Sequence, residues 1–365
     1  MKLIALKDKL LNAAHIAEKI VGKKESLPVL SCIFIDADRD CSVRATNLEA
    51  AVEIRIIGEI EEKGKVAVPA SILSQTLRSI RSDKVQLKTE GLNLVIESRG
   101  TRTLIKALPH EEFPLFPSGV EDDGINLSRE STLRGLASVL YAASPSMIRP
   151  ELGSVYISVR QGEVAFVATD SFRLAEKKIK EKNARKGADI LIPLKHAGEL
   201  IHILERIAND HVRLFTEEAQ LTVSTPEFRF VSRVIDASFP NYIEIVPKTS
   251  TTEATLLKND FAEMLRKARV FSGGESRVGL HVYPKKKIFT ATAQNQDVGE
   301  MSDFLEAAVS GDDIDINFHI GYLSDCLASI ASDSIALGFS GPGKPLVIRG
   351  ISDSSFMYLV MPLNR

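Results

Sequence analysis

The sequence predicts an α+β fold of three repeats, each with two helices packed on antiparallel sheet, because segments far apart in the chain share one pattern. Segments that begin at Lys65, Asp189 and Ile314 each contain a short apolar strand, an amphipathic helix and a strand of the type Asp-x-Val-x-Leu. Each is followed by two alternating strands and an end that contains proline. A period of about 120 residues suits a whole domain and is too long for a solenoid unit.

The first half of each repeat matches more loosely, as a helix, a strand, a turn and a second strand. Apolar residues recur on the helices at spacings of three and four, for example at Leu10, Ala14 and Ala17. Each helix therefore buries a narrow stripe and keeps a solvated side. The expected helices are residues 8–21, 131–143 and 259–271, and the second strands end in Ala-Thr at Ala45, Ala168 and Ala291.

The strand segments alternate apolar and polar side chains, as in residues 85–88 and 154–159. Such alternation is typical of antiparallel sheet with one wet face, whose dry face the helices can cover. Polar segments that contain proline follow completed strands near Val120 and Lys248. We therefore expect three domains, at residues 1–120, 121–248 and 249–365.

Composition limits the class of protein. The chain has 365 residues, of which 44% are hydrophobic, and these values suit two or three globular domains. Its start lacks a signal-peptide pattern, and no stretch reaches the roughly 18 apolar residues of a membrane span, so a cytoplasmic protein is expected. Cys32, Cys41 and Cys326 are too few and too scattered for a disulfide framework or a zinc site, and we expect buried thiols.

A search for catalytic motifs finds no phosphate-binding loop, no dinucleotide fingerprint and no hydrolase or metalloprotease signature. The seven histidines are dispersed, so neither a metal nor a cofactor is expected. The best candidate dyad is Asp170 with Arg173, a combination that is more often a structural ion pair. We expect a protein that is not an enzyme, and an enzyme that uses Asp170 stays open as an alternative.

Basic residues recur on the solvated side of two expected helices. Lys9, Lys19 and Lys23 form one stripe with Asn12, and Lys195, His202 and Arg206 form another. Exposed basic residues on a helix are also often simply solvated and bind no partner. The net charge of −2 argues against a globally basic surface. Charge placement therefore decides whether a nucleic acid binds.

Six further segments follow one another along the chain. They are LPVLSCIFID from Leu27, ATNLEAAVEI from Ala45, ALPHEEFP from Ala107, VATDSFRLAEKK from Val167, RVIDASFPNYIEIVP from Arg233 and the terminal VMPLNR. Together they resemble the bacterial sliding clamp, the beta subunit of DNA polymerase III, and the resemblance covers the entire chain. It implies two three-domain subunits that close head to tail into a six-domain ring, with helices around the central hole and sheets outside.

The resemblance implies a homodimer that encircles duplex DNA and tethers the replicative polymerase, which confers processivity. Other implied partners are the clamp loader, translesion polymerases and repair proteins. A ring that slides contacts phosphates and does not read bases, so DNA binding independent of sequence is expected. The residues implied for DNA are Lys9, Lys23, Lys24, Arg149 and Lys195. A peptide-binding scaffold of the same fold without a DNA role remains an alternative.

The resemblance also implies a pocket between the second and third domains for a short peptide similar to Gln-Leu-x-Leu-Phe. Its residues would be Leu152, Thr169, Ser171, Phe172, Arg173, Leu174, Pro240, Ile245, His319, Tyr322, Val360, Met361, Pro362 and Leu363. The same residues could instead be an ordinary interdomain core. Phe172, Glu244 and Asn364 depart from the family pattern, which leaves the peptide preference open.

The subunit seam implied by the resemblance pairs a strand in residues 99–107 with the acidic segment 297–306. Pairing would hide two sheet edges that otherwise invite aggregation. An ordinary surface strand is the alternative. In the expected seam, Arg102 and Thr103 lie on the first strand, Arg102 faces Glu300, Asp303 or Glu306, and Ile105 packs near Val270 and Phe271.

Overall fold

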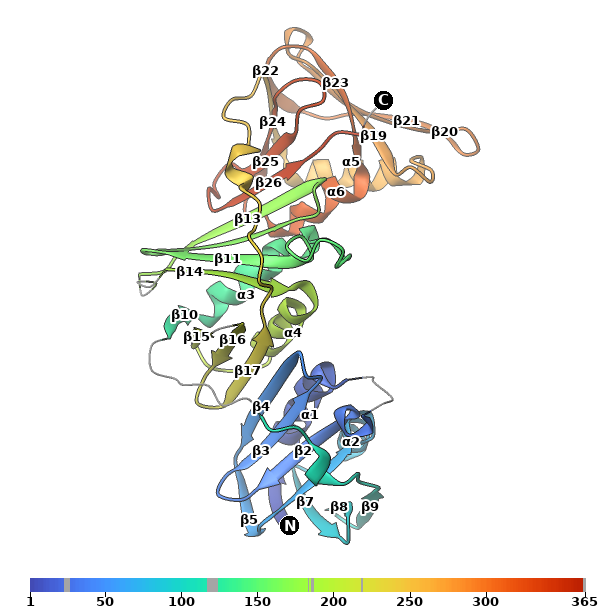
Figure 1. The fold of residues 1–365 in the computed structure, drawn as a ribbon. Helices are drawn as coiled ribbons and strands as arrows, with labels where there is room; N and C mark the ends of the chain where they lie inside the picture. Colours follow the sequence, from blue (N-terminus) through green and yellow to red (C-terminus); the bar gives the residue numbers. More distant parts are fainter. Residues whose placement is uncertain (23–26, 117–123, 183, 185–186, 218, 364–365) are drawn as a thin grey trace. The chain divides into compact units, whose positions relative to one another are not determined.

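The computed structural model describes residues 1–22, 27–116, 124–182, 184, 187–217 and 219–363. It divides into two compact units (Figure 1). Unit 1 contains Met1–Leu133 and Lys195–Val234, and unit 2 contains Arg134–Leu194 and the chain from Ile235 onward. Each unit is built on two antiparallel sheets.

Unit 1 holds a five-stranded and an eight-stranded sheet. The strands of the first, in spatial order, are β5 (Gly58–Glu62), β1 (Lys2–Leu6), β7 (Lys84–Glu90), β8 (Asn93–Ser98) and β9 (Thr101–Ile105). Those of the second are β10 (Ile125–Ser128), β15 (His211–Glu217), β16 (Gln220–Ser224), β17 (Phe228–Arg233), β4 (Ala50–Ile56), β3 (Cys41–Thr46), β2 (Cys32–Ala37) and β6 (Gly64–Pro69).

Unit 2 holds a nine-stranded and a four-stranded sheet. The strands of the first are β14 (Ala188–Pro193), β11 (Ser154–Arg160), β12 (Glu163–Thr169), β13 (Arg173–Lys180), β26 (Phe356–Val360), β25 (Leu346–Gly350), β24 (Ser334–Phe339), β18 (Thr252–Leu257) and β22 (Ala307–Gly311). Those of the second are β21 (Gly299–Phe304), β20 (Ile288–Asn295), β19 (Arg277–Tyr283) and β23 (Ile314–His319).

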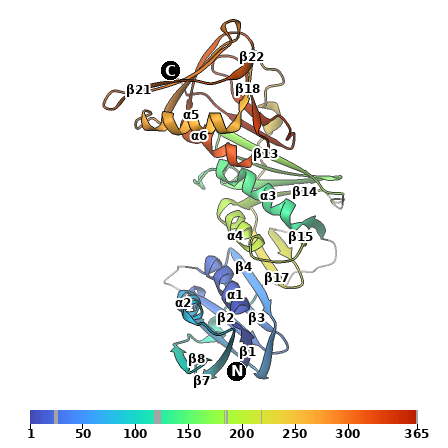
Figure 2. The same cartoon turned by 180° about the vertical axis from the view of Figure 1, so that it is seen from behind.

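Two helices per repeat confirm the expected pattern, and their buried residues follow the predicted stripes. On α1, Leu10, Ala14 and Ala17 are all fully buried. α1 packs on α2 within unit 1, and α5 packs on α6 within unit 2 (Figure 2). The helices are α1 (Lys7–Ile20), α2 (Ala70–Ser79), α3 (Arg129–Val139), α4 (Leu194–Leu204), α5 (Lys258–Val270) and α6 (Ile320–Asp325).

The third helix ends earlier than expected. The periodicity predicts a helix to residue 143, but α3 ends at Val139 and continues as the 3-10 turn Leu140–Ala142. Ala143 is nevertheless buried, so the apolar stripe extends beyond the regular helix. A periodic pattern reports which side chains are buried and leaves open whether the last turn is α or 3-10.

Neighbouring repeats are joined by direct strand pairing inside each unit. In unit 1, β17 pairs with β4, with Ser232 opposite Ala50. In unit 2, β26 pairs with β13, with Val360 opposite Arg173. Both large sheets therefore run without a break from one repeat into the next, which makes backbone hydrogen bonds the connection between domains.

The turn before β4 shows why the second strand ends in Ala-Thr in the first two repeats. In the third repeat the expectation is wrong, because Ala291 and Thr292 lie inside β20, which runs to Asn295. The Thr46 hydroxyl donates to the carbonyl of Ala50 at 3.0 Å. The Asn47 side-chain oxygen accepts from the amides of Glu49 (2.9 Å) and Ala50 (2.7 Å). Leu48 takes a φ of 75°, an unusual value for a leucine that these bonds hold in place.

The turn before β13 repeats this framework. Thr169 donates to the carbonyl of Arg173 at 2.6 Å, and Asp170 accepts from the amides of Phe172 and Arg173, both at 2.9 Å. Ser171 has a φ of 78°. The two turns therefore have the same conformation, fixed by the same short polar side chains.

The cysteines and the expected boundaries can now be placed. Cys32, Cys41 and Cys326 are buried free thiols, as expected.

The boundary expected near Val120 lies outside the described residues, and the one near Lys248 falls between a 3-10 turn at Tyr242–Glu244 and β18. Both boundaries stay predictions. No helix in the described part of the chain is long and apolar enough to cross a membrane.

The junction in unit 1 buries an acid that has no close hydrogen-bond partner. Glu199 of α4 is 7% exposed, and neither of its carboxylate oxygens makes a hydrogen bond within the described part of the chain. Its ion-pair partner is Lys195, whose ammonium nitrogen lies 3.7 Å away. Burial raises the pKa of Glu199 from an ordinary 4.5 to about 7, although Lys195 opposes the rise.

This raised pKa predicts that stability falls as the pH rises. A folded-state pKa above the unfolded value gives stability that is complete below about pH 4.5 and is lost as the pH rises through about 7. We expect a loss of at most about 3 kcal/mol across this window. Urea unfolding at pH 5.5 and at pH 8 measures the change. Between these two pH values, the free energy of unfolding of the Glu199→Gln variant should fall much less than that of the original protein. The matched control is Glu205→Gln, at an exposed acid just beyond α4; equal pH dependence in all three proteins would contradict the assignment.

Candidate functional site

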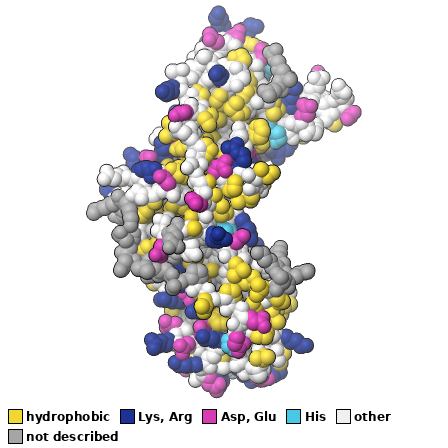
Figure 3. All heavy atoms as spheres, viewed as in Figure 1, with side chains coloured by type: hydrophobic (Ala, Val, Ile, Leu, Met, Phe, Trp, Pro, Cys, Tyr) yellow, Lys and Arg dark blue, Asp and Glu magenta, His cyan; other side chains and the backbone are white. Residues whose placement is uncertain are grey.

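The residues expected to form the peptide pocket all lie in unit 2. They come from the segment before β11, the turn between β12 and β13, the segment after β17, the start of α6 and the end of β26. These segments are far apart in sequence, and the pairing of β26 with β13 brings the chain end beside the turn. In the view of Figure 3, hydrophobic side chains lie at the surface of unit 2 in the region of β13 and β26.

The floor of this region is a closed apolar cluster. Leu174 is 3% exposed and packs with Val167, Tyr242 and Leu359, and the partly buried Met361 lies against them. Leu152, Thr169 and Val360 are also buried. These three residues therefore support the pocket from behind, because a bound peptide could contact little of their surface.

Arg173 connects the turn to α6. Its Nε donates to Asp170 at 3.0 Å and its Nη1 donates to Asp325 at 2.5 Å. The guanidinium also lies over the ring of Tyr322, 4.5 Å from its centroid, and 5.8 Å from that of Tyr141. A planar guanidinium suits both kinds of contact, so Arg173 holds one wall of the pocket in place.

Asp170 acts as a structural acceptor. Its carboxylate receives two backbone amides of its own turn and the Nε of Arg173. These contacts use both oxygens and account for the Asp170–Arg173 pair as an ion pair within the fold. The sequence did not identify Asp325 or Tyr141 as partners of Arg173. One sequence signal could have pointed to Asp325. It is the sixth residue of α6, and the sixth residue of α4 is also an acid, Glu199.

The exposed part of the region is largely apolar. Phe172 is 60% exposed and Ile245 is 53% exposed. The chain end is tied down on both sides, because the Met361 amide donates to the Phe172 carbonyl and the Leu363 amide donates to the Asn317 carbonyl, both at 2.8 Å. Asn364 lies outside the described residues.

The remaining polar residues of the region are few. The rings of His319 and Tyr322 are 4.5 Å apart. Burial, with a smaller effect of Arg173, lowers the pKa of His319, so the imidazole is neutral at neutral pH. Pro240 and Pro362 are partly buried, Ser171 is exposed, and Asn241 donates to the Glu244 carboxylate at 2.6 Å. Apolar walls with few polar groups suit apolar side chains as ligands.

The residues expected to contact DNA divide between the two units. Lys9 on α1 and Lys195 on α4 are exposed in unit 1, and Arg149 is exposed in unit 2, where it pairs with Glu151 at 3.0 Å. Lys23 and Lys24 lie outside the described residues.

The two basic stripes predicted on helices meet in unit 1. Asn12 on α1 donates to the carbonyl of Arg206, just beyond α4, at 3.2 Å. His15 lies 3.1 Å from Arg78 on α2, and burial, followed by the charge of Arg78, lowers its pKa. His202 has a pKa lowered by burial and by Arg206. Helices α1, α2 and α4 therefore gather cationic side chains, and burial, followed by these neighbouring charges, disfavours the protonated form of both histidines.

The two strands expected at the subunit seam are both edge strands. β9 ends the five-stranded sheet and β21 ends the four-stranded sheet. Arg102 on β9 pairs with Glu90 at 2.5 Å, and Asp303 on β21 pairs with Lys267 at 2.9 Å, while Glu300 and Glu306 are exposed.

The burial of Ile105 is at odds with its expected place in the subunit seam. Ile105 is 3% exposed inside unit 1, so it has almost no surface for a second subunit, whereas the adjacent Leu104 is 45% exposed. The period-two alternation of a strand explains this difference, because neighbouring side chains point to opposite faces. At the second expected edge, Phe304 at the end of β21 is 59% exposed and Val270 at the end of α5 is 63% exposed.

Models of one protein family match almost the entire chain. The N-terminal domain of the DNA polymerase III beta subunit matches residues 1–117, its central domain matches residues 126–241, and its C-terminal domain matches residues 243–364. No cluster of candidate metal ligands occurs among the described residues.

Individual relatives have low identity and full coverage. The beta sliding clamp of Staphylococcus epidermidis is 24% identical, with 100% of this chain and 99% of the relative covered. That of Staphylococcus aureus is 24% identical over 95% of this chain and 94% of the relative.

Solved structures share the fold. The beta subunit of DNA polymerase III from Thermotoga maritima superposes with a TM-score of 0.95 at 24% identity, covering 100% of this chain and 99% of that one. The DNA polymerase sliding clamp of Bacillus subtilis gives a TM-score of 0.92 at 23% identity, with the same coverage.

Proposed function

The chain belongs to the family of DNA polymerase III beta subunits, and on this premise we propose how it works as a DNA sliding clamp in replication. Two copies form a closed ring around duplex DNA and tether the replicative polymerase to it. The observation that carries this proposal is the strand pairing between repeats, which leaves one junction for a second copy to complete.

The order of strands identifies that junction. The strands β4, β13 and β21 hold the same place in the three repeats, each being third after the first helix. The strands β17, β26 and β9 are each the last of a repeat. Within the chain, β4 pairs with β17 and β13 pairs with β26, while β21 and β9 stay at sheet edges. The same rule applied once more pairs β21 of one subunit with β9 of another.

Charge and apolar surface favour this pairing. The β9 edge carries the exposed cations Arg102 and Lys106, while the β21 edge carries the acids Glu300 and Asp303, with Glu306 just beyond it. The chain's own junction in unit 1 likewise sets Arg229 opposite Glu53. Leu104 on one side, and Val270 with Phe304 on the other, supply the apolar area that a stable interface needs. Thr103 and Phe271 remain in the proposed seam.

A contact between two different surfaces must close into a ring or continue as a filament. Two subunits of three domains each give the closed six-domain ring that the family resemblance implies. Closure also pairs the exposed edges of β9 and β21, which removes one route to aggregation.

DNA binding would rest on phosphate contacts. Lys9, Lys195 and the cations gathered on α1, α2 and α4 form a helical surface in unit 1, and Arg149 contributes from unit 2. With a net charge of −2, the chain has no excess of cations to spread over its whole surface. Contacts from a few placed cations are weak and independent of sequence, as sliding requires. Lys23 and Lys24 join this proposed set by resemblance.

The apolar region around Met361 is proposed as the partner site. Phe172, Ile245 and Met361, over the buried Leu174, would accept the leucine and phenylalanine of a peptide similar to Gln-Leu-x-Leu-Phe. Polymerases, the clamp loader and repair proteins would compete for it. Asp170 serves the fold, so we propose that the protein has no catalytic activity, and that it acts in the cytoplasm.

The seam predicts a specific loss of assembly. Changing Val270 and Phe271 together to alanine removes apolar side chains beside β21, so the protein should become monomeric by light scattering. Ile57→Ala is the control, because Ile57 is 92% exposed and lies outside the proposed seam. Dimers of the double variant that persist at micromolar concentration would show that the subunits meet elsewhere.

The DNA surface predicts a uniform electrostatic effect. Arg149→Gln with Lys195→Gln should weaken binding to any duplex by a similar factor and lower the slope of log affinity against log salt by about 2. Fluorescence anisotropy on duplexes of unrelated sequence measures both. Lys344→Gln, at an exposed loop lysine, is the matched control. Losses that depend strongly on sequence would contradict a sliding contact.

The partner site predicts a loss of peptide binding without loss of fold. Met361→Ala with Pro240→Ala should weaken a Gln-Leu-Ser-Leu-Phe peptide by about thirtyfold in calorimetry, because desolvated apolar contacts can each contribute about 2 kcal/mol. Circular dichroism checks the fold, and Ile351→Ala, at a residue 57% exposed in unit 2, is the control. Binding at the original affinity in the folded double variant would rule out this pocket.

A further inference from the structure

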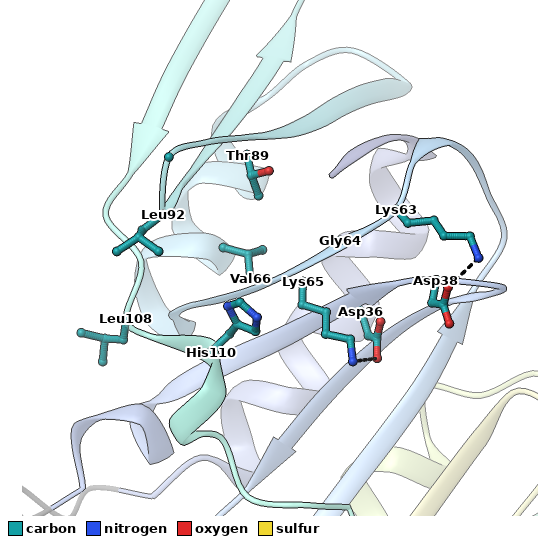
Figure 4. Close-up of a pocket in the computed structure, with 11 residues that line it drawn as sticks. Asp36, Asp38, Lys63, Gly64, Lys65, Val66, Thr89, Leu92, Leu108 and His110 are labelled. Carbon is teal, nitrogen blue, oxygen red and sulfur yellow. Dashed lines mark ion pairs between the residues drawn. The ribbon is translucent and has the colours of Figure 1, made fainter.

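A hollow of about 450 Å³ lies at the open edge of β6 in unit 1 (Figure 4). It is bounded by β6, by the end of β2, by the turn between β7 and β8, and by the segment that follows β9. The residues that line it are Asp36, Asp38, Lys63, Gly64, Lys65, Val66, Thr89, Gly91, Leu92, Leu108 and His110. None of these residues belongs to the peptide pocket, the proposed DNA surface or the proposed seam.

The edge of β6 is partly used by the chain itself. β6 is the terminal strand of the eight-stranded sheet and pairs with β2 on one side. On its other side the described residues form a single bridge, in which the Leu108 amide donates to the Ala67 carbonyl at 2.9 Å. This contact shows that a segment can run along the edge in antiparallel direction.

The bridging segment leaves the edge after one residue. Pro109 follows Leu108 and has no amide hydrogen to donate, and the chain then turns into a 3-10 helix at His110–Glu112. In an antiparallel strand, alternate residues direct their backbone groups to opposite sides. Since the Ala67 carbonyl points away from β2, the amide and carbonyl of Lys65 point the same way, toward the hollow.

Side chains around the hollow offer both apolar and charged contacts. Leu92, which is 63% exposed, lies across the hollow from Lys65, while Leu108, which bridges to β6, and His110 lie along its lower side (Figure 4). Lys65 lies 3.6 Å from Asp36, a loose pair, and Asp36 is also held by Arg44 at 3.5 Å. Lys65 can therefore turn to another anion without leaving Asp36 unpaired.

We propose that this hollow binds an extended peptide segment of a partner protein, which adds a strand to the free edge of β6. The backbone of the segment bonds to Lys65, an apolar side chain packs on Leu92 and Leu108, and an acidic side chain meets the ammonium group of Lys65. Strand addition of this type obtains affinity from main-chain bonds and selectivity from the flanking side chains. The site would give the protein a second contact for partners that already occupy the pocket around Met361.

Fluorescence anisotropy with the full-length protein tests the proposal. The probe is a labelled, end-capped peptide Thr-Leu-Glu-Val-Asp-Thr, and the matched probe replaces both acids by lysine. The acidic peptide should bind saturably, and the lysine peptide about tenfold more weakly or not at all. N-methylation of its central amides, which blocks strand pairing, should weaken it by at least about tenfold.

Two protein variants locate the binding. Leu92→Asp changes an exposed side chain at the hollow and should weaken the acidic peptide by about tenfold or more, while Met361→Ala should leave its affinity unchanged. Absence of saturable binding at about 1 mM peptide would overturn the proposal. Binding that is insensitive to Leu92→Asp or to N-methylation, or that favours the lysine peptide, would overturn it as well. None of these outcomes depends on whether the ring holds DNA.

Discussion

Backbone pairing between the last strand of one repeat and the third strand of the repeat before it is the interaction on which this structure depends. It occurs between β4 and β17 in unit 1 and between β13 and β26 in unit 2. Unpaired strand edges expose a row of donors and acceptors, so a protein must cover, pair or disrupt them. Here the edges become the joints of the molecule. The side chains at the joints differ, as Arg173 with Asp325 at one joint and Arg229 with Glu53 at the other illustrate.

A clamp assembled in this way needs little affinity for DNA. In the proposed ring, the hold on the duplex comes from closure, and the proposed β9–β21 seam sets the strength of that closure. Phosphate contacts then have a different task, which is to keep the duplex centred without stopping its movement. This division explains how a chain with a net charge of −2 can act on DNA.

The sequence was sufficient for the repeats, the paired helices and the family, because periodicity and the Ala-Thr turns are local signals. The residues that it predicts for the pocket all lie in one unit, and their role as a pocket stays a prediction. It could not show that α3 stops at Val139, that Ile105 points inward while Leu104 points out, or that Asp325 and Tyr141 hold Arg173. Each of these depends on tertiary packing. The hollow beside β6 also escaped detection, because an open strand edge has no signature in a single sequence.

The most direct test of the account measures retention on DNA of different topology. The protein is closed by its clamp loader onto a nicked circular duplex, and gel filtration at moderate salt separates bound from free protein before and after the circle is cut once. A topological ring should remain on the circle and be lost from the linear product through its ends. Equal retention on both forms would mean that surface affinity, and not encirclement, holds the protein on DNA.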